Sequence, residues 1–206
     1  MIKLQNIYIK YHSDFYSLYD YSRDIKSHTL FVGDFFSGSL ALMRILSGID
    51  TNYQGNCIID EIDIKDIKNK DFTVAYLPQD PVLFNYKTVE KNLIYTLKIR
   101  KINKNIIKNT VFEYKNHYKI NFFDKKIKSL NISERKIVAL LRAIIRKPKY
   151  ILLENFYENL DEKYFPIVNQ ILSDIKNNTT IIACENERKN IDIFDDFDIV
   201  KLSNSN

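Results

Sequence analysis

The sequence is poor in the residues that build tight turns and cross-links. Its 206 residues include four glycines, four prolines, two cysteines and no tryptophan. Cys57 and Cys184 lack the clustered spacing of metal ligands, so we expect two buried thiols rather than a disulfide or a metal site. No run approaches the roughly 18 apolar residues of a membrane-spanning helix, and the first residues lack the apolar core of a signal peptide. We therefore expect an intracellular, cytoplasmic chain that reaches a membrane only through a partner.

Charge of one sign is only slightly in excess. The 31 lysines and arginines outnumber the 26 acidic residues, giving a net charge of +5, and most of the lysines are scattered. One cluster is compatible with an anionic surface, but a solvated helix face is the simpler interpretation. We expect no nucleic-acid partner, and the 45% hydrophobic content suffices for the core of one domain. The cluster consists of Lys98, Arg100, Lys101, Lys104 and Lys108.

The four glycines all fall in one short window, at Gly33, Gly38, Gly48 and Gly55. Residues 30–48 within this window predict a buried strand, a loop between two glycines, and a helix with an apolar face. This is the frame of a phosphate-binding loop, in which backbone N–H groups and the positive end of a helix surround the phosphates. Elsewhere the sequence has no glycine with which to build another such cradle.

The frame lacks the side chains that carry the phosphate chemistry. The working pattern is G-x-x-x-x-G-K-[ST], but here Ser39 stands at the lysine position and Leu40 at the hydroxyl position. Two glycines at this spacing are also common by chance. On this segment alone, an ordinary strand-loop-helix connection is the alternative interpretation.

Short apolar strands alternate with amphipathic helices along the chain. This alternation predicts an α/β fold with a mostly parallel sheet covered by helices, antiparallel edge strands and an inserted helical subdomain. We expect a helical pattern over residues 80–140, a helix over 137–145, another over 162–175, and a loose tail at 203–206. The expected strands span residues 2–9, 18–25, 29–32, 56–60, 62–64, 72–77, 150–153, 179–184 and 198–202.

Several short segments keep a characteristic order. They are the loop and helix 33–48, Tyr76-Leu77-Pro78-Gln79-Asp80, Thr88-Val89-Glu90-Lys91-Asn92-Leu93, Leu130-Asn131-Ile132-Ser133-Glu134, Ile151-Leu152-Leu153-Glu154-Asn155 and Asn159-Leu160-Asp161. In this order they resemble the Walker A loop, the Q-loop, the entry to the helical lobe, the signature, the Walker B strand and the D-loop of an ABC transporter ATP-binding subunit. The stretch after Thr88 is similar to importer-type members.

The resemblance implies a P-loop NTPase-type fold in a single domain over residues 1–206. The nucleotide-binding core would comprise 1–79 and 141–202, and the helical subdomain 80–140. It also implies nucleotide contacts, including an aromatic residue that stacks on adenine, a signature segment and a dimer face. The nucleotide-binding positions are Tyr11, Gly33, Asp34, Phe36, Ser37, Gly38, Ser39, Leu40 and Gln79; the signature-like positions are Leu130, Asn131, Ile132, Ser133 and Glu134; the dimer-face positions are Leu160 and Asp161.

The loop departs from the family pattern at three positions that meet phosphate or magnesium. Ser39 brings no positive charge to the terminal phosphates. Leu40 offers magnesium no ligand. Phe36 replaces a loop glycine, and its side chain obstructs close approach of phosphate to the backbone. ATP with magnesium is therefore expected to bind weakly.

The catalytic positions depart in the same way. Glu154 keeps a carboxylate at the Walker B position and, with Gln79, is a candidate to reach a metal. Asn155 stands where the catalytic glutamate belongs, and an amide cannot act as a general base. Glu185 replaces the switch histidine and brings a negative charge where γ-phosphate would lie.

The signature-like segment lacks both family glycines. In the family this segment grips the γ-phosphate bound to the partner subunit, so a dimer containing this chain would be weakened at both sites. We therefore expect a pseudo-ATPase that is a structural or regulatory half of a transporter. Its expected partners are a transmembrane permease and a homologous ATP-binding subunit, identical or different, at the cytoplasmic face of a membrane.

Three alternatives remain open at this stage. The first is a nucleotide-binding sensor or regulator without turnover, in which Tyr11 and the backbone from Gly33 to Gly38 hold ATP. The second is a slow, divergent ATPase that uses Glu154 in an altered geometry. The third is an interaction protein that has left transport altogether.

Overall fold

The computed structural model describes residues 1–12, 15–33, 37–67, 73–186 and 192–202, without the side chains of residues 11, 12, 15 and 16. The chain forms two compact units. Unit 1 comprises residues 1–76, 149–155 and 180–206, and unit 2 comprises residues 77–148 and 156–179. The predicted division into a core and a helical subdomain at residues 80 and 140 remains a prediction.

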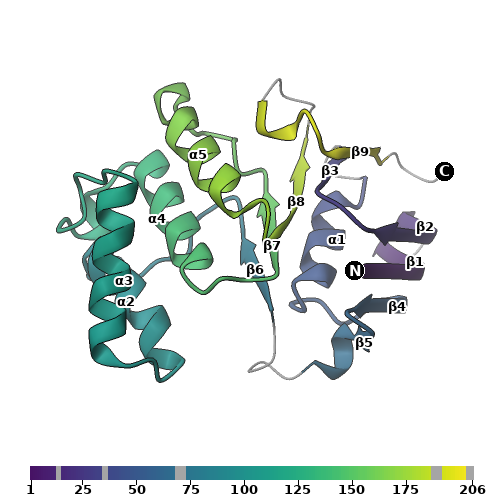
Figure 1. The fold of residues 1–206 in the computed structure, drawn as a ribbon. Coiled ribbons are helices and arrows are strands. Elements are labelled where there is room, and N and C mark those ends of the chain that lie inside the picture. The colour runs from purple at the N-terminus through teal and green to yellow at the C-terminus, as the bar shows by residue number, and fades with distance from the viewer. Residues whose placement is uncertain (13–14, 34–36, 68–72, 187–191, 203–206) are drawn as a thin grey trace. The chain divides into compact units, whose positions relative to one another are not determined.

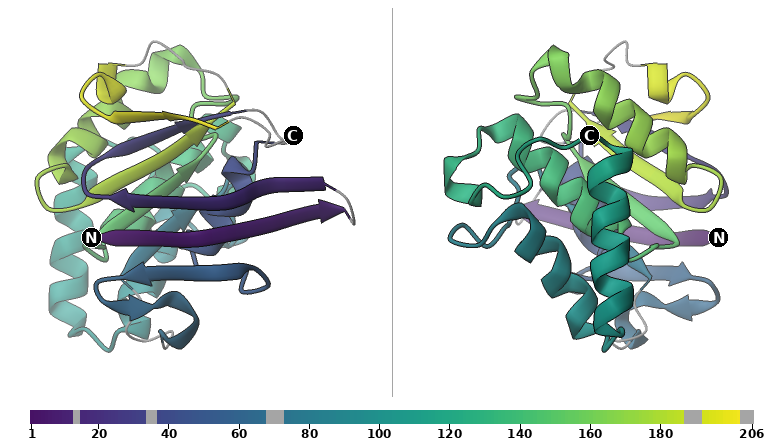
Figure 2. Two further views of the ribbon diagram at one scale, coloured as in Figure 1. Left: turned by 90° about the vertical axis from the view of Figure 1, so that its right-hand side faces the viewer. Right: turned by 60° about the vertical axis from the view of Figure 1, so that its left-hand side comes forward.

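An antiparallel sheet forms one layer of unit 1. Its strands are β1 (Ile2–His12), β2 (Phe15–Ile25), β4 (Gln54–Ile59) and β5 (Ile62–Asp63), in the order β2-β1-β4-β5. Figure 2 shows β1 lying between β2 and β4. The predicted antiparallel edge strands are confirmed, although β1 and β2 extend further toward each other than the apolar alternation indicated.

The second sheet contains the strands whose ends were predicted to hold the site residues. Its order is β6-β7-β8-β3-β9, and β3 is parallel to both β8 and β9, as β7 is to β8. Buried, mostly aliphatic runs form β3, β7 and β8, as expected for strands covered on both faces, whereas β9 has exposed residues at both ends. Their bounds are β3 (Thr29–Val32), β6 (Val74–Leu77), β7 (Tyr150–Glu154), β8 (Thr180–Glu185) and β9 (Asp198–Lys201).

Helix α1 (Ser39–Leu46) lies between the two sheets of unit 1 (Figure 1). Its buried residues, including Leu42, Met43 and Ile45, contact apolar side chains from both sheets. Cys57 and Cys184 belong to this core as free thiols, and burial raises the pKa of Cys57 to about 12. The prediction of two buried, unpaired cysteines is confirmed.

Unit 2 is helical. Helix α2 packs against α3 and α4, and α4 packs against α5. Helix α4 begins five residues before the predicted start at residue 137, because Asn131 caps it there. Among the described residues, no helix has both the length and the apolar character needed to cross a membrane. The bounds are α2 (Val89–Ile99), α3 (Lys104–His117), α4 (Ile132–Ile144) and α5 (Phe165–Ile175), with short 3-10 turns at Ile127–Ser129 and Glu162–Tyr164.

Candidate nucleotide-binding site

The strand-loop-helix frame predicted around the first two glycines is present in unit 1. Strand β3 ends at Val32, and the N–H of Gly33 donates to the carbonyl of Glu185 at 3.2 Å. Gly38 precedes the first turn of α1, where its carbonyl accepts from Leu42 N–H at 2.9 Å. The end of β3 and the end of β8 are therefore held together beside the loop. The predicted positions Asp34 and Phe36 lie outside the described residues.

Two buried serines lie in the described part of the loop. Ser37 and Ser39 are both buried, and the N–H of Ser39 lies 3.4 Å from Ser37 Oγ. A Cβ placed on Gly33 would lie only 2.3 Å from Ser37 Oγ, so the serine hydroxyl packs directly against the glycine. Leu40 is half-buried against the core of unit 1 and has no oxygen with which to ligate a cation.

The end of β7 places two further candidate residues in unit 1. The hydroxyl of Tyr76, at the end of neighbouring β6, donates a hydrogen bond to the Glu154 carboxylate. Asn155 follows with a positive φ of 40°, and its N–H donates to the carbonyl of Cys184 at 2.9 Å. Asparagine is one of the few residues that tolerates this backbone region. The residue at the predicted base position therefore also has a backbone role.

Glu185 ends β8 and is 2% exposed. Its neighbour across the sheet in β3 is Val32, so the carboxylate belongs to the same sheet edge as the loop. Of the remaining predicted contacts, Tyr11 lies in β1, where its side chain is outside the described part of the chain. Gln79 belongs to unit 2 and is half-buried.

The signature-like segment forms the capped start of helix α4 in unit 2. Asn131 Oδ1 accepts from Glu134 N–H at 2.8 Å, and Glu134 Oε2 accepts from Asn131 N–H at 3.0 Å. These two bonds form a capping box, which satisfies backbone donors that a helix start otherwise leaves free. Leu130 is buried and Ile132 is exposed. Two backbone N–H groups of the segment are therefore hydrogen-bonded to side chains of the same segment.

The D-loop-like segment is tied to the same helix start. Ser133 is fully buried, and its hydroxyl accepts from Asp161 N–H at 3.0 Å. Leu160 is also buried, whereas the Asp161 side chain is 57% exposed and lies 3.4 Å from Lys163. Of the two predicted dimer-face residues, Asp161 is therefore the one whose side chain reaches solvent.

Comparison with known proteins decides the family. A profile described as ABC transporter matches residues 26–156 of this chain. The chain belongs to the ABC transporter family. The predicted resemblance is confirmed at this level.

Relatives and solved structures of the ABC transporter family agree with this assignment. The molybdate/tungstate import ATP-binding protein WtpC of Pyrococcus abyssi is 31% identical over 149 residues, which are 71% of this chain and 43% of that protein. The sn-glycerol-3-phosphate import ATP-binding protein UgpC of Bordetella avium is 32% identical over 133 residues, 64% of this chain and 37% of that protein. The chain thus covers less than half the length of these two curated relatives.

The solved structure of the dimeric ATP-binding cassette MJ0796, in a post-hydrolysis state with ADP and Pi, matches with a TM-score of 0.84. The match covers 98% of this chain and 94% of that chain, at 20% identity. At this identity the likeness shows the fold, and the predicted α/β, P-loop NTPase-type fold is confirmed.

Two polar contacts in this ABC-type chain escaped the sequence analysis. The Tyr76 to Glu154 bond depends on how β6 and β7 lie in the sheet, and residue spacing carries no signal for it. Lys136 is 1% exposed on α4, and its Nζ donates to the carbonyl of Phe156 at 2.9 Å. A signal existed for Lys136, since it lies four residues before buried Leu140 on the apolar face of the helix.

One cavity in unit 1 is lined by none of the predicted site residues. This cavity, of about 600 Å³, is lined by Met1, Lys3, Gln5, Ile58, Asp60 and Glu61. In the described part of the chain, no group of three or more histidine, cysteine, aspartate or glutamate side chains is placed to hold a metal ion.

Proposed function

We propose that this chain is the ATP-binding-subunit type of ABC transporter component, importer-like, and that it does not hydrolyse ATP. In this proposal it is a structural or regulatory half of a transporter, paired with a permease and a homologous ATP-binding subunit. The names of WtpC and UgpC, both import ATP-binding proteins, support the importer type. The observation that carries the loss of hydrolysis is the capping box of α4.

The capping box opposes phosphate binding in two ways. A helix start attracts anions through its free N–H groups and its positive dipole end. At α4, the Asn131 and Glu134 side chains accept from two of these N–H groups, and Glu134 adds a carboxylate at the same place. A γ-phosphate presented by a partner subunit would meet an occupied and negatively charged helix start.

The loop in unit 1 supports the same conclusion for phosphate and magnesium. Ser39 brings no positive charge to the loop, and the half-buried Leu40 has no ligand atom for magnesium. Glu154 is the remaining carboxylate of the Walker B position. It accepts a hydrogen bond from Tyr76, so it is not kept solely for a metal ion. These features support the proposal that the site does not hold a magnesium-bound triphosphate as hydrolysing ABC ATPases do.

Turnover of ATP tests the proposal directly. We expect purified protein to release no phosphate from ATP with magnesium above the rate of Asn155→Ala, because an amide cannot deprotonate water. Asn116→Ala, an exposed asparagine on α3, is the matched control for loss of an amide. Magnesium-dependent turnover that disappears in Asn155→Ala and persists in Asn116→Ala would overturn the proposal.

A rescue variant tests the alternative of a slow ATPase. Ser39→Lys combined with Asn155→Glu restores the phosphate-binding charge and the base together. If the rest of the site were still able to hydrolyse ATP, turnover should rise sharply in this variant. We expect no turnover, because Leu40 and the α4 capping box are unchanged.

Copurification tests the partners. The tagged chain, extracted in mild detergent from its own cells, should bring down a permease together with an intact ATP-binding subunit. Recovery of a permease without any intact ATP-binding subunit would contradict the pairing. Recovery of soluble proteins alone would contradict a role in transport.

A nucleotide sensor without turnover is the second candidate function. The observation in its favour is the retained backbone frame from β3 to α1, in which a loop begins beside the ends of two strands. Calorimetric titration with millimolar ATP, with and without magnesium, checks it. Absence of heat would remove this candidate and leave the structural role.

A further inference from the structure

The two units carry opposite charge. Unit 2 contains 19 lysines and arginines against nine aspartates and glutamates, a formal net charge of +10. Because the whole chain has a net charge of +5, unit 1 carries −5. The slight excess of positive charge in the sequence therefore hides one strongly basic unit, which favours contact with an anionic surface.

The positive charge is most concentrated where helices α2 and α4 end. Arg100, just past α2, donates through Nη1 to the carbonyl of Arg146, just past α4, at 3.2 Å. The stretch between Glu90 and Glu113 has no acidic residue. We call six basic residues, Arg100, Arg146 and four lysines close to them in the sequence, the basic corner. They are Lys98, Arg100, Lys101, Lys104, Arg146 and Lys147.

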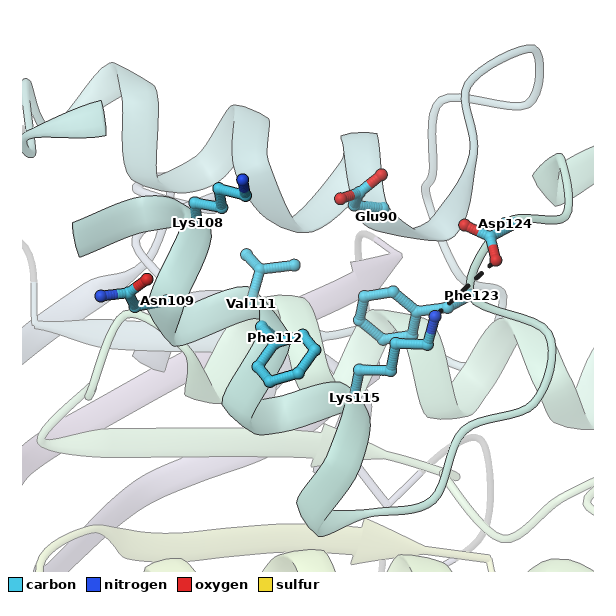
Figure 3. A pocket seen from close by; sticks show the side chains of 8 residues that line it. All are labelled: Glu90, Lys108, Asn109, Val111, Phe112, Lys115, Phe123 and Asp124. Atoms are coloured by element: carbon cyan, nitrogen blue, oxygen red, sulfur yellow. Dashed lines mark ion pairs between the residues drawn. The ribbon is translucent and has the colours of Figure 1, made fainter. Parts of the chain in front are cut away.

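The basic corner differs from one cavity in the same unit. That cavity, of about 340 Å³, holds two lysines and two carboxylates, and Lys115 Nζ lies 3.7 Å from Asp124 (Figure 3). Among the described residues, no member of the basic corner makes an ion pair with a carboxylate. Burial, and then the charge of Arg100, lower the pKa of Arg146. The corner thus gathers positive charge without internal compensation.

Three lysines of the basic corner lie at positions with a local cost, either in backbone strain or in the helix-dipole interaction. Lys101 and Lys147 have φ angles of 55° and 52°, in the left-handed region that favours glycine. Lys104 is the first residue of α3, where a positive charge opposes the helix dipole. At Lys104 the charge is unfavourable for the isolated helix, which points to a use for it outside the fold. At Lys101 and Lys147 the charge also favours the end of the preceding helix, as it does at Lys119 outside the basic corner.

Exposed aliphatic side chains lie among these charges. Ile99 is 65% exposed at the end of α2, and Ile106 is 57% exposed in the first turn of α3. We propose that the basic corner binds directly to the surface of a membrane that contains anionic lipids, with Ile99 entering the headgroup region. Lysines attract the anionic headgroups, and an exposed aliphatic side chain adds apolar burial at the interface. This contact needs neither a permease nor ATP.

The side-chain types favour a lipid surface over a nucleic acid. Single-stranded nucleic acids are held by aromatic side chains on which bases stack. The tip of the basic corner instead presents an isoleucine, and four of its six charged residues are lysines. Isoleucine has no flat π face for a base, whereas it is well suited to the boundary between headgroups and acyl chains.

Vesicle sedimentation tests the proposal with the purified full chain. We expect binding to phosphatidylcholine vesicles that contain phosphatidylglycerol, little binding to phosphatidylcholine alone, and loss of binding at high salt. The triple variant Lys98→Gln, Lys101→Gln, Lys104→Gln should bind at least about tenfold more weakly, since each lysine near an anionic membrane contributes about fivefold. Ile99→Ser should weaken binding by about threefold without changing the salt dependence.

The matched control removes the same charge elsewhere in unit 2. Lys119→Gln, Lys125→Gln, Lys126→Gln changes three exposed lysines outside the basic corner and should retain most of the binding. Equal loss in both triple variants would overturn the proposal, because net charge alone would then explain binding. Failure of the chain to bind anionic vesicles, or its displacement from them by stoichiometric single-stranded RNA, would overturn it too. Far-UV circular dichroism of each variant checks the fold.

Discussion

Helices in the two units end in the same motif with different residues. At the end of α1 in unit 1, Gly48 N–H donates to Ile45 and Ile49 N–H donates to Arg44, and Gly48 has a φ of 71°. At the end of α3 in unit 2, Lys119 N–H donates to Asn116 and Ile120 N–H donates to Lys115, with a φ of 50° at Lys119. Both patterns are Schellman motifs, which glycine normally closes.

The difference follows from where the glycines are. All four lie before residue 56, in unit 1, so the helices of unit 2 must end without them. A lysine in the left-handed region costs backbone strain but places a positive charge at the negative end of the helix dipole. Unit 1 therefore uses glycine where its backbone must approach another strand or loop closely. In unit 2, the attraction between a lysine and the helix dipole takes the place of the conformational freedom of glycine. The following predictions test this contrast.

Gly55→Ala should have the largest effect. Gly55 has a φ of 93°, and an added Cβ would lie 2.1 Å from the backbone carbonyl oxygen of Asn6, where β1 and β4 shift register. We expect a loss of about 3 kcal/mol in unfolding free energy, since backbone and not a flexible side chain must move. Urea unfolding measures the loss, and hydrogen exchange should rise at β1 and β4 while α2 to α4 stay protected.

The neighbouring exposed residue supplies the control for this prediction. Gln54→Ala lies in the same strand, and its unfolding free energy should stay within about 0.5 kcal/mol of the parent chain. Exchange that rises equally in both units after Gly55→Ala would show that the units do not respond separately.

Asn92→Ala should have the next largest effect, in unit 2. The fully buried Asn92 amide accepts from Phe84 N–H at 2.9 Å and donates to the carbonyls of Phe84 and Thr88 at 3.3 and 2.9 Å. Its loss leaves buried backbone groups without partners, at about 2 kcal/mol. Thermal unfolding followed by circular dichroism measures it, with exposed Asn109→Ala as the control. Equal stability of the two variants would contradict this role.

The order of elements could be predicted because apolar runs record burial. The runs at β3, β7 and β8 are continuous, and buried parallel strands require such runs. The outer part of β1 could not be bounded, because Ile9 is only half-buried and Lys10 is exposed, so the alternation fades before the strand ends. The start of α4 could have been predicted from the sequence, since Asn131 and Glu134 have capping-box spacing.

The candidate site was predictable as a set of positions but not as a set of contacts. The apolar runs predicted strand ends at Val32, Leu153 and Cys184, and the last two strands end one residue later, at Glu154 and Glu185. The Tyr76 to Glu154 bond depends on sheet order, which no local pattern contains. The packing of Ser37 on Gly33 likewise depends on the loop path and not on residue type.

Asp60→Asn should have a moderate effect that depends on pH. Burial raises the pKa of Asp60, but hydrogen bonds from Lys149, the Met1 ammonium and Tyr150 outweigh it and lower the pKa to about 2. The carboxylate therefore contributes stability above its ordinary pKa of 3.8, and this contribution is lost as the pH falls through about 2. Discounted for partial exposure, we expect a loss of about 1 kcal/mol at neutral pH.

Urea unfolding of Asp60→Asn and the parent chain at neutral pH and near pH 3 checks this prediction. The difference between them should fall by about half near pH 3. Asparagine tolerates the φ of 49° at this position, so the backbone contribution is matched. A difference that stays constant with pH would assign the effect to shape and not to charge.

A reciprocal exchange should have the smallest effect and bears directly on the contrast between units. Gly48→Lys should destabilise by about 1 kcal/mol, because it introduces a side chain into the left-handed region. Lys119→Gly should stabilise by only about 0.5 kcal/mol, since relief of strain is offset by a more flexible unfolded chain and by loss of the charge at the helix end. Differential scanning calorimetry at low and high salt separates these terms. If electrostatics supports the lysine, the gain in Lys119→Gly must grow with salt, because screening removes the dipole contribution and leaves the strain. A gain that does not change with salt would mean that Lys119 closes its helix without electrostatic help.

Lys101→Gly, at the same position after α2, should show the same stability pattern and in addition weaken binding to anionic vesicles, which Lys119→Gly should leave largely intact.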